Sequence, residues 1–133
     1  MSNSNKIKNK NHRSLLVKFL GLFQSEQITT IPNWLNEERN SDQKSKSNAA
    51  SKILKFAKEV NLTQSKLLEI YQIECEYEEK KHEAFEQFPH LPQIMNKDIS
   101  GFRSLKIDKL KLALTKSQFD VYSKLFRKNK QHY

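Results

Sequence analysis

The pattern of apolar residues along the chain predicts helices almost throughout. Apolar side chains recur every three or four residues, as on one face of an amphipathic helix, in segments 11–24, 49–60, 64–88, 101–114 and 116–130, and a short helix is predicted at 31–35. Segment 101–114 also alternates as a strand would, but helix is favoured because no partner strand is evident. The predicted fold class is all-α, a small bundle of five or six helices.

Capping residues and prolines set several of the predicted helix ends. Thr63 is predicted to cap the long helix 64–88, because a short oxygen-bearing side chain accepts a hydrogen bond from a free N–H group at a helix start. Pro89 and Pro92 end that helix, since proline cannot continue the helical hydrogen-bond ladder. Thr115 and Gln118 have the spacing of a capping box, which places the start of the last helix.

Two polar stretches interrupt the apolar pattern. Residues 1–11 hold almost only Ser, Asn and Lys, a composition that predicts a disordered basic arm. Residues 36–48 are also nearly all polar and predict an exposed connection, after which Ser47 or Asn48 caps the next helix. The remainder, 12–133, is predicted to form a single helical domain. With 2 glycines and three valines among 133 residues, tight hairpins and β-branched strands have little support.

Several classes of protein are disfavoured by residues that are scarce or scattered. The single cysteine, Cys75, excludes an internal disulfide framework and a multi-cysteine zinc site, and it is interpreted as a packing residue. No apolar run approaches the length of about 20 residues that spans a bilayer, so we expect a cytoplasmic protein without integral membrane association. The histidines and glycines form no catalytic or phosphate-binding pattern, which predicts a non-enzymatic protein without a cofactor.

Charge is distributed unevenly around a formal net charge of +9. Residues 1–20 carry five basic groups and no acid, and 96–133 carry ten basic groups against three aspartates, whereas 61–95 carry seven glutamates against three lysines. Lysine-rich segments contact phosphates without reading base identity, so the favoured function is binding of DNA or RNA through the backbone. The predicted phosphate-contacting residues are Lys6, Lys8, Lys10, Arg13, Arg103, Lys106, Lys109, Lys111, Lys116, Lys124, Arg127, Lys128 and Lys130.

A local pattern at 53–72 resembles a helix-turn-helix. The small and apolar slots of that motif are filled by Phe56, Ala57, Val60, Asn61, Leu62, Leu67 and Ile70. The resemblance implies that Thr63, Gln64 and Ser65, at the start of the second helix, are candidate base-contacting residues. An ordinary antiparallel helix pair is the favoured interpretation, because the second helix continues into a run of glutamates that phosphates would repel.

That glutamate run is interpreted as a solvent-exposed helix face. Glu74 and Glu78 are four residues apart, but no histidine stands in register to suggest a metal or acid–base site. Glu76 with Lys80, and Glu78 with Lys81, have the spacing of surface ion pairs. Docking of this acidic face on a basic partner remains a second interpretation.

Two alternatives to nucleic-acid binding stay open. The first is a protein–protein interaction module, an adaptor or inhibitor of the kind that a phage or mobile element carries, acting on a nucleic-acid-processing partner. The low fraction of apolar residues suggests this alternative, because it predicts a small core that a partner would complete. The second is an amphipathic helix at 14–23 that lies on an anionic membrane surface.

Overall fold

The computed structural model describes residues 30–126, which fold into five helices and contain no strand. They are α2 (Asn33–Arg39), α3 (Lys44–Ala57), α4 (Gln64–Gln87), α5 (Pro92–Ala113) and α6 (Lys116–Phe126). The predicted all-α class is therefore confirmed. The predicted helix at 11–24 and the basic arm at 1–11 lie outside the described residues.

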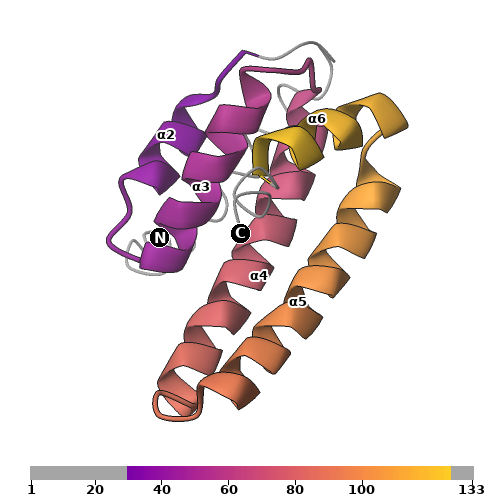
Figure 1. Ribbon diagram of the computed structural model, residues 1–133. Coiled ribbons are helices and arrows are strands. Elements are labelled where there is room, and N and C mark those ends of the chain that lie inside the picture. Colours follow the sequence, from indigo (N-terminus) through magenta and orange to yellow (C-terminus); the bar gives the residue numbers. More distant parts are fainter. Residues whose placement is uncertain (1–29, 127–133) are drawn as a thin grey trace, which may run out of the picture.

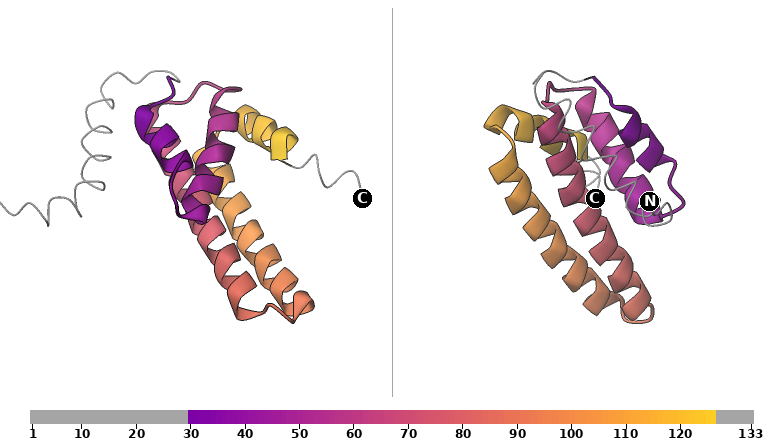
Figure 2. Two further views of the ribbon diagram at one scale, coloured as in Figure 1. Left: turned by 90° about the vertical axis from the view of Figure 1, so that its left-hand side faces the viewer. Right: turned by 180° about the vertical axis from the view of Figure 1, so that it is seen from behind.

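The two longest helices, α4 and α5, form an antiparallel hairpin against which the other helices pack (Figure 1). The helix pair α2 and α3 packs beside the first half of α4, and α6 crosses the same end of the hairpin between α3 and α5. The loop end of the hairpin extends beyond the other helices (Figure 2). The fold thus has a thick end built from five helices and a thin end built from two.

The core follows this division. At the thick end the fully buried large apolar side chains come from α2, α3, α4 and α5, namely Leu35, Ile53, Phe56, Leu67, Ile70 and Leu110. Trp34 of α2 packs against the ring of Tyr71 of α4, with 5.4 Å between ring centroids, and the Tyr71 hydroxyl donates a 2.7 Å hydrogen bond to Glu38. A second, smaller apolar cluster extends toward the thin end, where Tyr77, Ala84 and Ile99 are buried and Met95 and Phe102 pack alongside. Most apolar burial therefore stabilises the thick end.

Three of the predicted helix boundaries are confirmed, two of them by their capping hydrogen bonds. The Thr63 hydroxyl accepts from the backbone N–H of Lys66 at 3.1 Å. Thr115 and Gln118 form the expected reciprocal box, with each backbone N–H donating to the other side chain at 3.0 and 3.1 Å. Helix α4 ends at Gln87, before the prolines, and α5 begins at Pro92, where the missing N–H costs no hydrogen bond. Segment 101–114 is helical, and its helix starts earlier than predicted.

The start of α3 was predicted wrongly. The helix begins at Lys44, with Gln43 as its N-cap residue, so neither Ser47 nor Asn48 caps it and the connection between α2 and α3 covers only 40–43. The polar residues of the first turn face solvent or bond to other elements, as when the Ser47 hydroxyl donates to the Arg39 carbonyl at 2.7 Å. A polar composition therefore concealed a helical turn.

Candidate functional site

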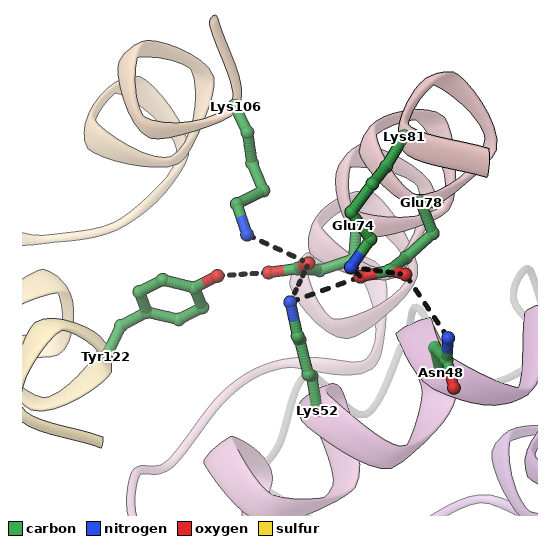
Figure 3. Close-up of polar contacts among 7 residues, drawn as sticks. All are labelled: Asn48, Lys52, Glu74, Glu78, Lys81, Lys106 and Tyr122. Carbon is green, nitrogen blue, oxygen red and sulfur yellow. Dashed lines mark hydrogen bonds and ion pairs between the residues drawn. The ribbon is translucent and has the colours of Figure 1, made fainter. Parts of the chain in front are cut away.

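A cluster of charged side chains lies inside the thick end of the bundle (Figure 3). Two glutamates of α4 are at its centre, with Glu74 fully buried and Glu78 only 2% exposed. Side chains from α3, α4, α5 and α6 converge on them. We call this set the charge cluster, and its members are Asn48, Lys52, Glu74, Glu78, Lys81, Lys106 and Tyr122.

Each carboxylate of the charge cluster is held by several partners. Glu74 accepts from the ammonium of Lys106, whose Nζ lies 3.3 Å from Oε1, and from the hydroxyl of Tyr122, while the Nζ of Lys52 lies 3.8 Å away. Glu78 lies 3.2 Å from the Nζ of Lys52. It is also bonded by two further donors, Lys81 at 3.3 Å and the Asn48 amide at 3.4 Å. Buried charges are tolerated when they are paired and hydrogen-bonded in this way.

The prediction that the glutamate run forms a solvent-exposed helix face is wrong for Glu74 and Glu78, and helix geometry gives the reason. On a helix with 3.6 residues per turn, both fall on the side that carries Leu67 and Ile70, which faces the other helices. The predicted pair of Glu78 with Lys81 does form, although it is largely buried. Exposed glutamates remain on the other side of α4, where Glu76 pairs with Lys109 of α5 rather than with Lys80.

Burial and pairing oppose each other in their effects on the pKa values of Glu78 and Lys106, and they act together on that of Tyr122. Burial alone raises the pKa of Glu78, but the ammonium groups of Lys52 and Lys81 outweigh it, so the pKa lies below its usual value. Burial lowers the pKa of Lys106 to about 8, against the opposing effect of Glu74. Burial and the Glu74 carboxylate raise the pKa of Tyr122, so its hydroxyl stays protonated and donates. At neutral pH the cluster therefore holds charged partners rather than a free acid or base.

Neither the cluster nor its surroundings supplies an obvious reactive group. Among the described residues, no group of three or more histidine, cysteine or carboxylate side chains is placed to hold a metal ion. Burial raises the pKa of the half-buried Cys75 to about 11, which leaves a protonated thiol packed against the core. The charge cluster links four helices through paired charges and hydrogen bonds, so its role is structural.

The predicted phosphate-contacting residues divide into three groups. Exposed cations are Arg103, Lys111, Lys116 and Lys124, and Lys109 is exposed but paired with Glu76. Lys106 is 7% exposed and pairs with Glu74, so its ammonium faces the interior. The others, Lys6, Lys8, Lys10, Arg13, Arg127, Lys128 and Lys130, lie outside the described residues. The structure brings Lys111 and Lys116 to the corner between α5 and α6.

Every ion pair among the described residues uses a glutamate of α4. Of the exposed cations of α5 and α6 named above, all except Lys109 have no carboxylate partner within the part of the chain that the structure describes. The same holds for three exposed lysines that sequence analysis missed, Lys44, Lys55 and Lys58, at and just beyond the ends of α3. Their signal was available, because α3 contains four lysines and no acid.

The start of α4 is occupied by structural hydrogen bonds. Gln64 is buried, and its Nε2 donates to the Thr30 carbonyl at 2.8 Å. The hydroxyl of Thr63 caps α4 and lies 3.2 Å from that of Ser65. Helices α3 and α4 run in opposite directions (Figure 1) and bury nearly all of the apolar slots of the helix-turn-helix pattern between helices. These slots therefore serve helix packing.

None of the described helices combines the length and the apolar character needed to cross a bilayer. No protein-family model, curated protein or solved structure matches this chain.

Proposed function

We propose that this protein is a non-enzymatic nucleic-acid-binding protein that contacts the phosphate backbone of DNA or RNA. The observation that carries the proposal is the separation of charge on the fold. The glutamates that form ion pairs all lie on α4, and apart from Lys109 the exposed cations named above on α3, α5 and α6 have no carboxylate partner in the described chain. Unpaired lysines are the groups that neutralise phosphates and release counterions.

The corner between α5 and α6 is the proposed centre of contact. Lys111 lies in the last turn of α5, and Lys116 is the first residue of α6. Lys124 lies in the last turn of α6, shortly before the basic segment 127–130. The Nζ of Lys111 lies 5.7 Å from the ring centroid of Phe119, a cation–π distance that fixes the direction of this side chain. Lys106 is left out of the contact surface because its ammonium is paired inside the bundle.

Salt dependence tests the proposal. Affinity for a 20-base-pair duplex and for a single-stranded RNA of the same length is measured by fluorescence anisotropy over a range of salt concentrations. Replacing Lys116 and Lys124 with glutamine removes two phosphate contacts. The slope of log affinity against log salt then becomes shallower by about 1.8 for duplex DNA, at about 0.9 per contact.

A matched control separates local contact from net charge. Replacing Lys66 and Lys80 of α4 with glutamine removes the same two charges from the glutamate-bearing helix, and this variant keeps the slope of the unmodified protein. Equal slopes for the two variants mean that only net charge matters and contradict the proposed surface. Absence of binding to either nucleic acid at low salt overturns the function itself.

A second function is supported by a separate observation. Within residues 30–126, the large apolar side chains that are exposed all lie on α4, α5 or the loop between them, and they are Phe85, Leu91, Ile94, Leu105 and Leu112. Apolar groups gathered on one hairpin favour a protein-binding module, an adaptor or inhibitor of a nucleic-acid-processing partner. Replacing Ile94 and Phe85 with serine removes binding of such a partner while nucleic-acid affinity is kept, whereas the Lys116 and Lys124 variant does the reverse.

A further inference from the structure

The outer face of α5 has no neighbour among the described helices. Helix α5 packs along α4 and meets α6 near its C-terminal end, and no described helix lies on its other side (Figure 1). Spacings of seven, four and seven residues place Ile94, Gly101, Leu105 and Leu112 in one line on this face, which we call the α5 stripe. Its three large apolar side chains are 44%, 58% and 89% exposed, in chain order.

Gly101, at the middle of the stripe, is not required by the described fold. It lies inside a 22-residue helix, where glycine is less stable than alanine. A Cβ atom added at Gly101 would have no neighbour from another part of the fold within 4 Å. Because glycine permits the close approach of another surface to the backbone, the stripe has room at its centre for a side chain from outside.

Charged residues lie on both sides of the stripe. On one side are Lys97 and Asp108, and neither forms an ion pair among the described residues. On the other side are Asp98, which also has no such pair, and Lys109, which pairs with Glu76 of α4. Both aspartates of this face are therefore available to cations outside the described chain.

We infer that the α5 stripe binds the α5 stripe of a second copy of this chain in an antiparallel dimer. If Gly101 of one copy lies opposite Leu105 of the other, Ile94 lies opposite Leu112, because each is seven residues further from the centre. A two-fold axis repeats both contacts. Leu105 then fills the space above Gly101, and the exposed apolar side chains cover one another.

The charges beside the stripe fit the same alignment. Lys97 is four residues before Gly101 and Asp108 is three residues after Leu105, so they face each other across the antiparallel pair. Asp98 and Lys109 face each other in the same way on the other side, and the two-fold axis repeats each contact. The contact of Lys97 with Asp108 carries the charge argument, because it joins two groups that have no ion pair within the described chain.

The antiparallel direction also suits the shape of the molecule. Ile94 lies toward the thin end and Leu112 toward the thick end, so the thick end of each copy lies beside the thin end of the other (Figure 1). A parallel pair would bring the two thick ends together and place Gly101 opposite Gly101, which leaves space unfilled. The stripe is only about 27 Å long at 1.5 Å per residue, so we expect a weak dimer that dissociates on dilution.

Exchange of charge tests the dimer and its alignment. The full-length protein, freed of nucleic acid, is measured by sedimentation equilibrium over a range of concentrations. Lys97→Asp and Asp108→Lys each turn two attractive contacts into repulsive ones and should weaken association by at least about tenfold. Mixing these two variants should restore dimers, because both contacts then join opposite charges. Lys55→Asp, on α3, makes the same change of charge away from the stripe and should leave association unchanged.

Gly101→Gln separates association from folding. In dilute solution, where the chain is monomeric, this variant should have a raised thermal midpoint, because glutamine is a better helix former than glycine. At high concentration it should weaken association by at least tenfold, since the space for Leu105 is filled. The matched variant Ser100→Gln, at an exposed position of α5 beside the stripe, should associate as the unmodified protein does.

Three outcomes overturn the proposal. An unmodified protein that stays monomeric at every concentration means that no second copy binds. Association that is unchanged in Lys97→Asp and Asp108→Lys assigns the dimer to another surface. Failure of the mixed variants to associate, when the unmodified protein does, contradicts the antiparallel alignment.

Discussion

The buried pair of Glu74 and Lys106 gives the sharpest test of the packing argument. Glu74 is fully buried and Lys106 is 7% exposed, with 3.3 Å between Nζ and Oε1. Removing one partner leaves the other as a buried charge with fewer partners, which costs about 3–5 kcal/mol. We expect this loss of unfolding free energy for Glu74→Leu, where Tyr122 also loses its acceptor, and for Lys106→Met.

The double variant is expected to recover most of that loss. Two apolar side chains of similar volume need no desolvation of charge, and such replacements range from neutral to stabilising by about 1–4 kcal/mol. Losing the hydrogen bond from Tyr122 to a charged acceptor offsets part of this gain, by about 1.5–3 kcal/mol. The double variant should therefore lie within about 3 kcal/mol of the unmodified protein, which gives a coupling free energy of several kcal/mol.

Chemical denaturation followed by far-ultraviolet circular dichroism measures all four members of this cycle. Because burial lowers the pKa of Lys106 to about 8, the measurements are made at pH 6.5, where its ammonium is charged. A variant that is too unstable alone is measured in a stabilising osmolyte, together with the other three proteins. Single variants that each lose less than about 1 kcal/mol and add independently would refute the assignment of a desolvated ion pair.

Three further predictions concern pH, capping and packing. The pKa of Glu78 lies below its usual value in the folded protein, so the unfolded chain binds the proton first and stability falls as pH drops through about 4.5; the unfolding free energy of Glu78→Gln, measured between pH 6 and 4, should decline less steeply. Thr63→Ala removes the cap of α4 and should lower the unfolding free energy, measured by urea denaturation, by about 0.5–2 kcal/mol. Thr63→Ser keeps the hydroxyl and should retain most of that stability. Leu110→Ala opens a cavity in the thick end and should cost about 2–5 kcal/mol, whereas Leu105→Ala, at an exposed position, should change the thermal midpoint little.

The fold was predictable to the extent that its signals are local. Proline, the Thr63 cap and the capping box of Thr115 and Gln118 act within one turn, and the structure confirms all three. The start of α3 was missed because solvent-facing Lys, Ser and Asn residues look alike in a loop and in a helical turn whose inner side is completed by Ala49 and Ala50.

The charge cluster was not predictable from spacing alone. Two glutamates spaced four residues apart on a helix are typical of an exposed charged face. The burial of Glu74 and Glu78 depends instead on cations from α3 and α5 that are distant in sequence. Lys52 is 22 residues before Glu74, and Lys106 is 32 residues after it. One local sign was available, since Glu74 stands in register with the apolar residues Leu67 and Ile70. A glutamate in register with an apolar helix face therefore indicates a lysine partner on the buried face of another helix.

The two sides of α4 have different roles. Its inner glutamates neutralise Lys52 and Lys106, so these lysines are not available to phosphates. Under the proposed function, its outer glutamates repel phosphates and favour contact through the corner between α5 and α6. Because this repulsion is electrostatic and screened by salt, replacing the exposed Glu79 and Glu83 with glutamine should raise nucleic-acid affinity at low salt more than at high salt. An equal change of affinity at both salt concentrations would contradict the role given to the outer glutamates.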